Sequence, residues 1–373
     1  MKKRYFLING IFLLAGVLLF SSWGSVGHKK INQHAPASFP IGMGFLKASW
    51  TILLANHASD ADYRKSSDPN EAPKHYIDID DYPEFRQSGK IAMSWDSIIS
   101  LHGNSFVIDK GILPWATLIT FDSVKSCFLR KDWNKAGLFA ADLGHYVADG
   151  HMPLHITANY NGQNSNQTGV HSRYESTMIG DYQTQINYQD DSVSFLPNVQ
   201  SSVFTYLYHN YIYVDSVLIA DKKADSIAGG TSGSTYYSNL WGYTGSFTTA
   251  LFKHASYALA GLVYTAWVEA GRPNMNPSAM EEFTNGDRSH LKISPNPFSN
   301  STTIKFEVTG INIQVNLSVL DSSGKTTHIL LQQDMNQGEY SINWDPKDLP
   351  TGSYFIVLSE NGRKYTQKAI LMK

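Results

Sequence analysis

The sequence predicts a mainly α-helical domain followed by a small all-β sandwich domain. Apolar residues recur at helical spacing from residue 23 to about residue 272, and they alternate with polar residues after residue 293. A polar stretch with prolines near its start, residues 274–292, separates the two patterns and predicts a linker. The chain has 373 residues, of which 42% are hydrophobic and 17% charged, so it can bury the cores of two folded domains.

Residues 1–22 predict a secretory signal peptide. Three basic residues precede an apolar run over residues 5–20, and small serines follow that run. The alternative is a retained membrane anchor, but the run is short for a helix that spans a bilayer. We therefore expect cleavage after Ser22, a mature chain that begins at Trp23, and no membrane-spanning segment after processing.

The region from residue 23 to residue 273 predicts a helical bundle. Its predicted helices cover residues 45–57, 91–101, 115–130, 135–150 and 246–270, and a short helix starts near His171. The helix at 246–270 is apolar on more than one face, which is typical of a central helix in a bundle. Residues 221–244 are rich in Gly, Ser, Thr and Tyr and predict a long surface loop.

The tail of the chain predicts a β-sandwich. Four segments alternate apolar and polar residues with a period of two, and they cover residues 302–308, 315–320, 340–344 and 353–358. Turn residues at 321–324 and 360–362 separate some of these segments. Short, regularly spaced strands of this kind indicate two sheets packed face to face.

Residues 145–175 contain the most informative pattern in the chain. His145 and Asp149 are four residues apart, His171 and Glu175 are four apart again, and His155 lies between the pairs. Residues at this spacing share one face of a helix, so each pair can direct two ligand atoms at one metal ion. Imidazole and carboxylate are the ligands of catalytic zinc sites. Two such pairs predict a site that holds more than one metal ion, whereas His151 is off the spacing and is expected to face solvent or to support a ligand.

The β-rich tail also carries several short motifs. They are SPNPF at 294–298, the turn at 321–324, GEY at 338–340, LPTGSY at 349–354 and the basic end at Lys373. Together they resemble the C-terminal sorting domain of the type IX secretion system over residues 293–373. The resemblance implies export, contact with the secretion machinery and a secreted or cell-surface location. A carbohydrate-binding β-sandwich is the alternative for this domain.

Upstream residues add further ligand types to the 145–175 pattern. Trp23 and His28 follow the expected cleavage point, Ala61-Asp62 comes next, and His75 follows it. In this order the chain resembles the zinc-dependent phospholipase C and S1/P1 nuclease superfamily, secreted helical enzymes with three zinc ions. Asp60 remains an alternative to Asp62, because Asp60-Ala61-Asp62 offers two carboxylates.

The resemblance implies three zinc sites in this chain. The first has Asp62, His75, His145 and Asp149; the second has His155, His171 and Glu175; the third has Trp23, His28 and Asp149, which bridges the first and third ions. Trp23 would bind through its free α-amine and carbonyl oxygen, since an amine with a pKa of about 8 can lose its proton near neutral pH. Asp62 is also the candidate catalytic residue, as acceptor of a proton from the attacking water.

The resemblance implies a secreted three-zinc phosphodiesterase that hydrolyses a phosphodiester bond with metal-activated water. The final glutamate of the 171–175 motif favours the phospholipase C type and a phospholipid substrate. The first alternative is an S1/P1-type single-strand nuclease and 3′-nucleotidase with the same metal centre. For that activity, the aromatic residues that could stack a base are Tyr63, Tyr146, Tyr160 and Tyr174. The second alternative is a non-enzymatic metal-binding surface protein.

Charge supports an anionic substrate that is recognised locally. The formal net charge of −2 excludes a protein that grips phosphate through bulk positive charge. Three Zn²⁺ with the carboxylates of Asp62, Asp149 and Glu175 would leave the pocket positive, which suits a phosphodiester. We expect the protein to be a monomer.

Overall fold

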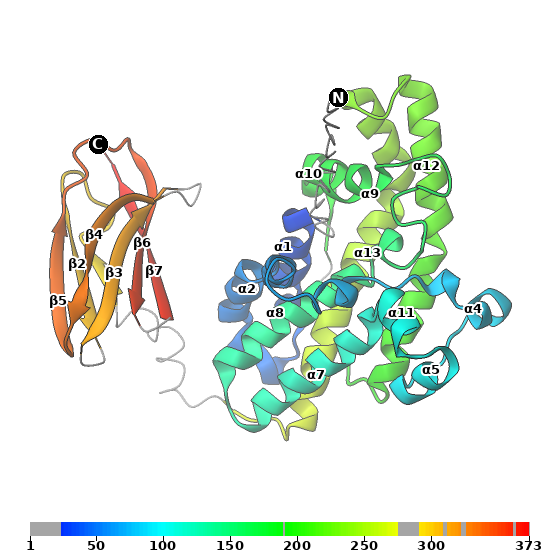
Figure 1. Ribbon diagram of the computed structural model, residues 1–373, viewed down its shortest axis with the longest axis horizontal. Coiled ribbons are helices and arrows are strands. Elements are labelled where there is room, and N and C mark those ends of the chain that lie inside the picture. The colour runs from blue at the N-terminus through cyan, green and yellow to red at the C-terminus, as the bar shows by residue number, and fades with distance from the viewer. Residues whose placement is uncertain are drawn as a thin grey trace, which may run out of the picture. The chain divides into compact units, whose positions relative to one another are not determined.

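The structure, a computed structural model of the chain, describes residues 24–188, 191–274, 291–308, 312–321, 326–360 and 363–372. The chain divides into two compact units, Met1–Pro273 and Asn274–Lys373 (Figure 1). The first unit is helical and the second is all-β, so the predicted fold class is confirmed. The expected signal peptide, Trp23 and most of the expected linker lie outside the described residues.

The helical unit contains α-helices of very different lengths. They are α1 (Gly24–His34), α2 (Lys47–Asn56), α3 (Asp60–Arg64), α4 (Pro83–Ser88), α5 (Trp95–His102), α6 (Asn104–Asp109), α7 (Leu113–Leu129), α8 (Trp133–Asp149), α9 (Val170–Ser172), α10 (Ile179–Tyr182), α11 (Val199–Tyr211), α12 (Tyr213–Ala228) and α13 (Gly233–Glu269). Short 3₁₀ segments connect them at η1 (Ala35–Ser38), η2 (Ile41–Leu46), η3 (Ala72–His75), η4 (Ile79–Asp81), η5 (Pro153–His155) and η7 (Gln183–Gln185). A π-helical turn, η6, covers Arg173–Met178.

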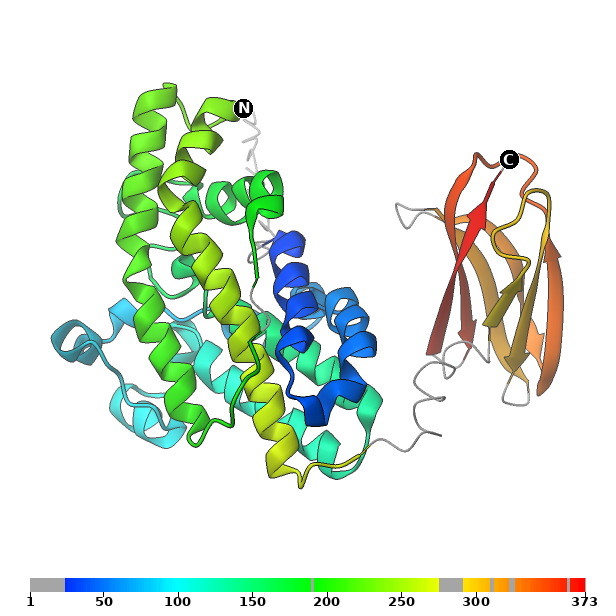
Figure 2. The same cartoon turned by 180° about the vertical axis from the view of Figure 1, so that it is seen from behind.

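Helix α13 is the long central element of this unit (Figure 2). It packs along α12 and also contacts α1, α7 and α8. Its buried side includes small residues such as Ala255, Ala260 and Gly261, which let neighbouring helices approach closely. The sequence places this helix correctly over residues 246–270 but misses its first turns.

The surface loop predicted for residues 221–244 is wrong. Helix α12 continues to Ala228 and α13 already begins at Gly233. Tyr236, Leu240 and Thr244 recur every four residues and are all buried. Their packing stabilises a helix that the weak propensity of Gly, Ser, Thr and Tyr does not predict, because most helix stability in proteins comes from tertiary burial.

Helix α8 is positioned by contacts at its start and along its length. The Asp132 side chain accepts a hydrogen bond of 3.2 Å from the Lys135 backbone N–H and caps the first turn. The buried Asn32 amide of α1 donates to Leu54 O at 3.2 Å and to Ala141 O at 3.0 Å. Asn32 therefore ties α1 to the end of α2 and to the middle of α8, one turn before His145.

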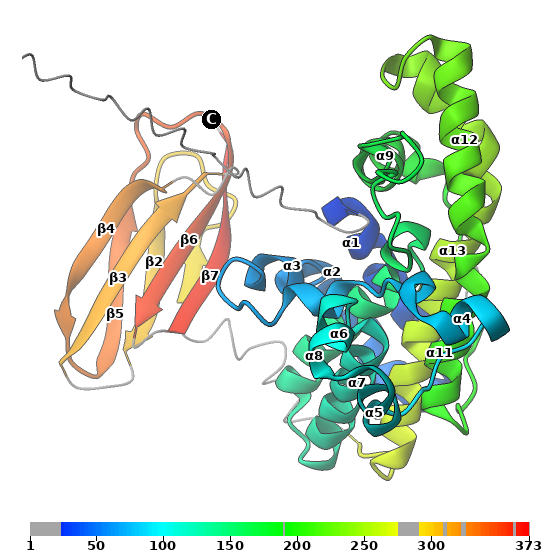
Figure 3. The same cartoon turned by 45° about the vertical axis from the view of Figure 1, so that its right-hand side comes forward.

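The β unit has two antiparallel sheets packed face to face (Figure 3). Its strands are β1 (Leu291–Ser294), β2 (Thr302–Val308), β3 (Ile313–Leu320), β4 (Thr326–Met335), β5 (Gly338–Trp344), β6 (Gly352–Glu360) and β7 (Arg363–Leu371). One sheet has the order β1-β2-β5 and the other β4-β3-β6-β7. Alternate residues of β2, β3 and β6 are buried in a common core, as the period of two predicts. The predicted turns at 321–324 and 360–362 fall mostly outside the described residues.

Candidate metal centre

The helical unit gathers three groups of histidine and carboxylate side chains. Within each group the ligand atoms lie within 4.8 Å of one another. The first group is Asp62, His75 and His145; the second is His155, His171 and Glu175; the third is His28, His145 and Asp149. Each ligand predicted from the sequence between residues 24 and 188 belongs to a group, whereas Trp23 lies outside the described residues.

Helix α8 supplies the residues that join the first and third groups. His145 and Asp149 are one helical turn apart and have no exposed surface. The His145 ring stacks on the His28 ring of α1, with 3.8 Å between centroids and 5° between planes. On its other side, His145 Nε2 lies 3.5 Å from Asp62 Oδ1 of α3. Three helices thus converge on one imidazole.

Asp149 lies at the centre of the histidines. Its Oδ2 is 3.1 Å from His75 Nδ1 and 3.5 Å from His145 Nε2. Its Oδ1 is 3.5 Å from His28 Nε2 and 3.4 Å from His155 Nδ1. Among the described residues Oδ1 is buried and makes no hydrogen bond. A buried carboxylate oxygen without a donor is costly unless a cation lies beside it, so Asp149 fits a metal-bridging position.

The second group comes from η5, α9 and the π-helical turn η6. His171 Nε2 lies 3.1 Å from Glu175 Oε1, and His155 Nε2 lies 3.4 Å from Glu175 Oε2. The two imidazole Nε2 atoms are only 3.2 Å apart. This convergence of imidazole and carboxylate atoms on one point suits a tetrahedral metal ion. A π-helical turn at this place is consistent with a functional site, where such turns are frequent.

Backbone carbonyls orient three of the histidines. In each case Nδ1–H donates to a main-chain oxygen, which leaves the Nε2 lone pair directed at the other ligands. The pairs are His145 with Ala58 O at 2.7 Å, His155 with His75 O at 2.7 Å, and His171 with Tyr160 O at 3.1 Å. Main-chain acceptors carry no sequence pattern, so sequence reasoning could not have found them.

Burial and neighbouring charges shift the pKa values of the buried groups in opposite directions. For His28, burial and then the charge of His145 lower the pKa to about 3. For His145, burial lowers the pKa, but the charges of Asp149 and Asp62 outweigh it and raise the pKa to about 9. Burial would raise the pKa of Asp149, yet the surrounding histidines hold it well below its usual range. The carboxylates of the cluster are therefore ionised at neutral pH, and a metal ion that bound His145 would displace its proton.

Of the two neighbouring carboxylates, the structure places Asp62 in the cluster. The Asp62 side chain is 10% exposed and also lies 2.6 Å from Lys65 Nζ. Asp60 is 40% exposed and its Oδ2 pairs with His57 Nδ1 at 2.7 Å. Asp60 thus has a local partner and does not reach the three ligand groups.

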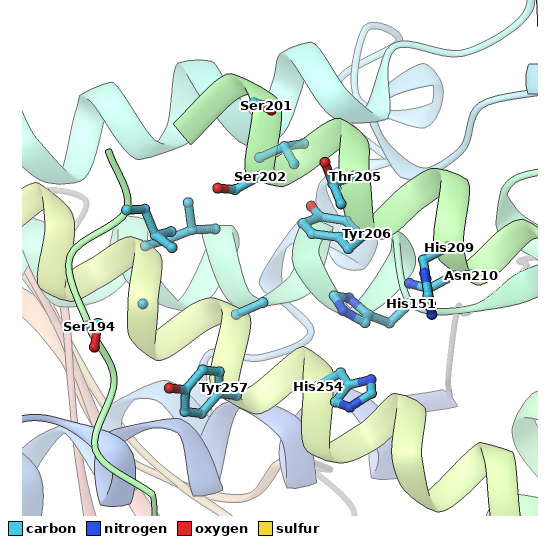
Figure 4. A pocket seen from close by; sticks show the side chains of 15 residues that line it. His151, Ser194, Ser201, Ser202, Thr205, Tyr206, His209, Asn210, His254 and Tyr257 are labelled. Carbon is cyan, nitrogen blue, oxygen red and sulfur yellow. The ribbon is translucent and has the colours of Figure 1, made fainter. Parts of the chain in front are cut away.

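His151 occupies a different environment from the ligands (Figure 4). It is 1% exposed, so the expectation that it faces solvent is wrong. Its Nδ1 donates to Val147 O at 2.7 Å, and its ring stacks on Tyr206 at 4.5 Å. It lines a separate cavity of about 440 Å³ that α11, α13 and the segment before α11 enclose. His254 and His209 line the same cavity from its exposed side.

Two of the four tyrosines considered as base-stacking residues are unsuitable. Tyr146 is 2% exposed and Tyr174 is fully buried, so neither can form a wall of an open pocket. Tyr63 and Tyr160 are 70% and 39% exposed. The Tyr160 ring meets His171 edge-on with 6.1 Å between centroids, which places an accessible aromatic ring beside the second group.

Comparison with known proteins identifies the β unit. The family model of the secretion system C-terminal sorting domain matches residues 292–372. The chain thus carries a sorting domain of a secretion system, and the protein is secreted or located at the cell surface. In the described residues, no helix combines the length and the apolar character needed to cross a membrane.

The other comparisons give distant matches or none. No curated protein matches the chain in sequence. Solved structures that match include the alpha toxin from Clostridium absonum, with 10% identity, a TM-score of 0.40 and coverage of 95% of each chain. They also include the alpha-toxin from an avian strain of Clostridium perfringens, with 10% identity, a TM-score of 0.41, and coverage of 94% of this chain and 97% of that one.

Proposed function

We propose that the helical unit is a secreted, zinc-dependent phosphodiesterase of the phospholipase C type. The observation that supports this most strongly is the convergence of eight buried or nearly buried histidine, aspartate and glutamate side chains in three groups. The first and third groups share His145, and Asp149 of the third group also lies beside His75 of the first and His155 of the second. Such a donor set fits zinc, which prefers imidazole and carboxylate in small coordination shells.

The ligands divide among three ions. Asp62, His75, His145 and Asp149 would hold the first ion, and His155, His171 and Glu175 the second. The third would lie between His28, Asp149 and the amine of Trp23, once cleavage has freed that amine. When bound, the ions would supply a water molecule of lowered pKa and would neutralise the charge of the phosphoryl oxygens.

The protein groups at the rim of the site would control proton transfer. Asp62 is more exposed than Asp149, His145 or His28, so it is the ligand carboxylate best placed to meet solvent. Burial would raise the pKa of Asp62, but the charge of His145 holds it well below its usual range, so the group is ionised at neutral pH. Its exposure at the edge of the cluster makes Asp62 the candidate acceptor of a proton from the attacking water.

The second group and its surroundings support two candidate substrate classes. Glu175 completes that group and matches the phospholipase C form of the motif. The exposed Tyr160 ring beside His171 favours one other candidate, a single-strand nuclease and 3′-nucleotidase that stacks a base on this ring. The same metal ligands would serve both reactions.

A parallel assay tests the proposal. The processed, zinc-loaded protein is incubated with phosphatidylcholine vesicles, single-stranded DNA and a 3′-nucleotide, each with and without chelator. We expect release of phosphorylated headgroup that chelator abolishes. Hydrolysis of DNA and the 3′-nucleotide alone would replace the phospholipase proposal by the nuclease. Binding of zinc without hydrolysis of any substrate would favour a metal-binding surface protein.

A further inference from the structure

His75 differs from His145, His155 and His171 in the group that lies beside its second ring nitrogen. Its Nδ1 faces the ligand cluster, 3.1 Å from Asp149 Oδ2 and 3.0 Å from His145 Nε2. Its Nε2 points away from the cluster and lies 3.6 Å from Glu71 Oε1. Within the described part of the chain this Nε2 is buried and makes no hydrogen bond. The carboxylate of Glu71 lies beside this nitrogen.

Glu71 is held in place by three donors. The residue is 1% exposed. Its Oε2 accepts from Lys74 Nζ at 2.7 Å, and its Oε1 accepts from Arg64 Nη2 at 3.3 Å and from the Tyr146 hydroxyl. Arg64 is itself fixed by Asp142, with 3.0 Å between Nη1 and Oδ1. The carboxylate thus has little freedom to move away from the His75 ring.

The carboxylate of Glu71 also has cations beside it. Two cationic side chains pair with its carboxylate, Lys74 at 2.7 Å and Arg64 at 3.3 Å. A carboxylate beside the N–H of an imidazole makes that imidazole a stronger electron donor. His145, His155 and His171 have neutral carbonyl acceptors in the corresponding position.

We propose that Glu71 is a positioning residue that accepts the Nε2–H of His75 and thereby sets the metal affinity of the first group. The inference rests on the proposed metal centre and adds to it a residue that is not itself a ligand. The negative charge of Glu71 orients the His75 ring, fixes its Nε2–H tautomer and raises the basicity of Nδ1. Loss of a carboxylate in this position typically weakens metal binding roughly 10- to 100-fold.

The test uses the full processed chain with Glu71→Gln. Glutamine keeps the size and one acceptor oxygen but removes the charge. Zinc per chain is counted by mass spectrometry, and zinc affinity is measured by competition with a chelator. We expect one ion of the set to bind roughly 10- to 100-fold more weakly, with the remaining ions unaffected. Glu71→Asp, which restores the charge, should recover part of the affinity.

A matched control lies elsewhere in the helical unit. Glu84 Oε1 pairs with His102 Nε2 at 2.9 Å, and neither residue belongs to a ligand group. Glu84→Gln makes the same chemical change in a glutamate–histidine pair, so it should leave zinc count and affinity unchanged. The thermal stability of each metal-free variant is measured alongside to detect general damage.

Three outcomes would overturn the inference. The first is unchanged affinity for every zinc ion in a folded Glu71→Gln variant. The second is equal weakening of all ions together with a less stable metal-free fold, which would mean that Glu71 only supports the structure. The third, a wild-type chain that binds no zinc, would refute the proposed metal centre itself and with it this role.

Discussion

Asp149 is the residue on which the proposed chemistry depends most. Four histidines, His28, His75, His145 and His155, lie within 3.1–3.5 Å of its two oxygens, and its side chain is fully buried. In water a carboxylate gains hydration that this site cannot supply. Positive charge must therefore come from protonated imidazole and, in the proposed metal centre, from metal ions.

The first prediction separates the two neighbouring aspartates. Asp62→Asn should remove zinc from the first group and lower phosphodiesterase activity at least about 100-fold, because a metal ligand and a proton acceptor are lost together. Asp60→Asn should keep both zinc and activity, since Asp60 only pairs with His57 at the surface. Zinc counting and the headgroup-release assay check both variants. The reverse result would assign the ligand to Asp60.

A second prediction concerns pH and His151. Burial, together with the charge of His254, lowers the pKa of His151 to about 4. The unfolded chain, with a histidine pKa near 6.5, takes up the proton first as pH falls, so this residue destabilises the fold progressively from pH 6.5 to pH 4. The full shift corresponds to about 3 kcal/mol.

The measurement compares wild type with His151→Asn, whose amide can replace the hydrogen bond to Val147 O. Both proteins are unfolded in urea with excess chelator at several pH values. The wild type should lose about 3 kcal/mol more than the variant between pH 6.5 and pH 4. Parallel curves for the two proteins would show that His151 is not held neutral by burial.

At the scale of elements, close helix packing sets the geometry of the site. A Cβ on Gly144 of α8 would come within 2.1 Å of Asn32 Oδ1 in α1 and 2.6 Å of Leu259 Cδ2 in α13. Gly144 directly precedes His145, and Asn32 lies one turn after His28. The absence of a side chain at residue 144 thus lets α1 approach α8 closely enough for His28 to stack on His145.

The third prediction tests this packing. Gly144→Ala should destabilise the protein by about 1–3 kcal/mol despite the better helix propensity of alanine, because the added methyl group forces α1 or α13 away. Gly242 lies at an exposed position of α13, where an added Cβ meets nothing within 4 Å, so Gly242→Ala should stabilise the protein by about 0.5–1 kcal/mol. Urea unfolding with chelator measures both. Equal effects of the two substitutions would contradict the role of Gly144.

The elements also show which features a sequence can predict. Helices α7 and α8 and strand β2 follow clear hydrophobic periods and lie within two residues of their predicted bounds. The start of α13 was missed because Tyr236 and Leu240 gain their burial only from tertiary contacts. Glu71 was missed although it precedes His75 by four residues, the same spacing as the two recognised pairs. It lies before a 3₁₀ segment rather than in a helix with a visible pattern.

At the scale of the whole molecule, the chain has two units with separate cores. The helical unit has its own buried core around Tyr174 and Phe252, and the β unit has another around Phe306 and Trp344. The β unit matches a sorting domain, and each of the three ligand groups lies in the helical unit. We therefore expect that the β unit directs export, that the helical unit carries the proposed catalysis, and that the two functions can be separated.

The fourth prediction removes the β unit. A chain truncated after Pro273 should fold, bind the same number of zinc ions and retain phosphodiesterase activity, because no ligand is lost. It should fail to reach the cell surface or medium, since the sorting domain is absent. Fractionation of producing cells, with zinc counting and assay of the purified protein, checks both halves. Normal export of the truncated chain would refute the role of the sorting domain.

The central claim is that this chain assembles a three-zinc centre on the ligands identified from its sequence. Its most direct test is X-ray diffraction from crystals of the processed protein, with data collected on both sides of the zinc absorption edge. The account predicts three anomalous peaks within about 2.0–2.3 Å of the ligand atoms, one of them beside the amine of Trp23. The absence of zinc peaks between His28, Asp149 and Glu175, in a protein purified without chelator and supplied with zinc, would contradict it.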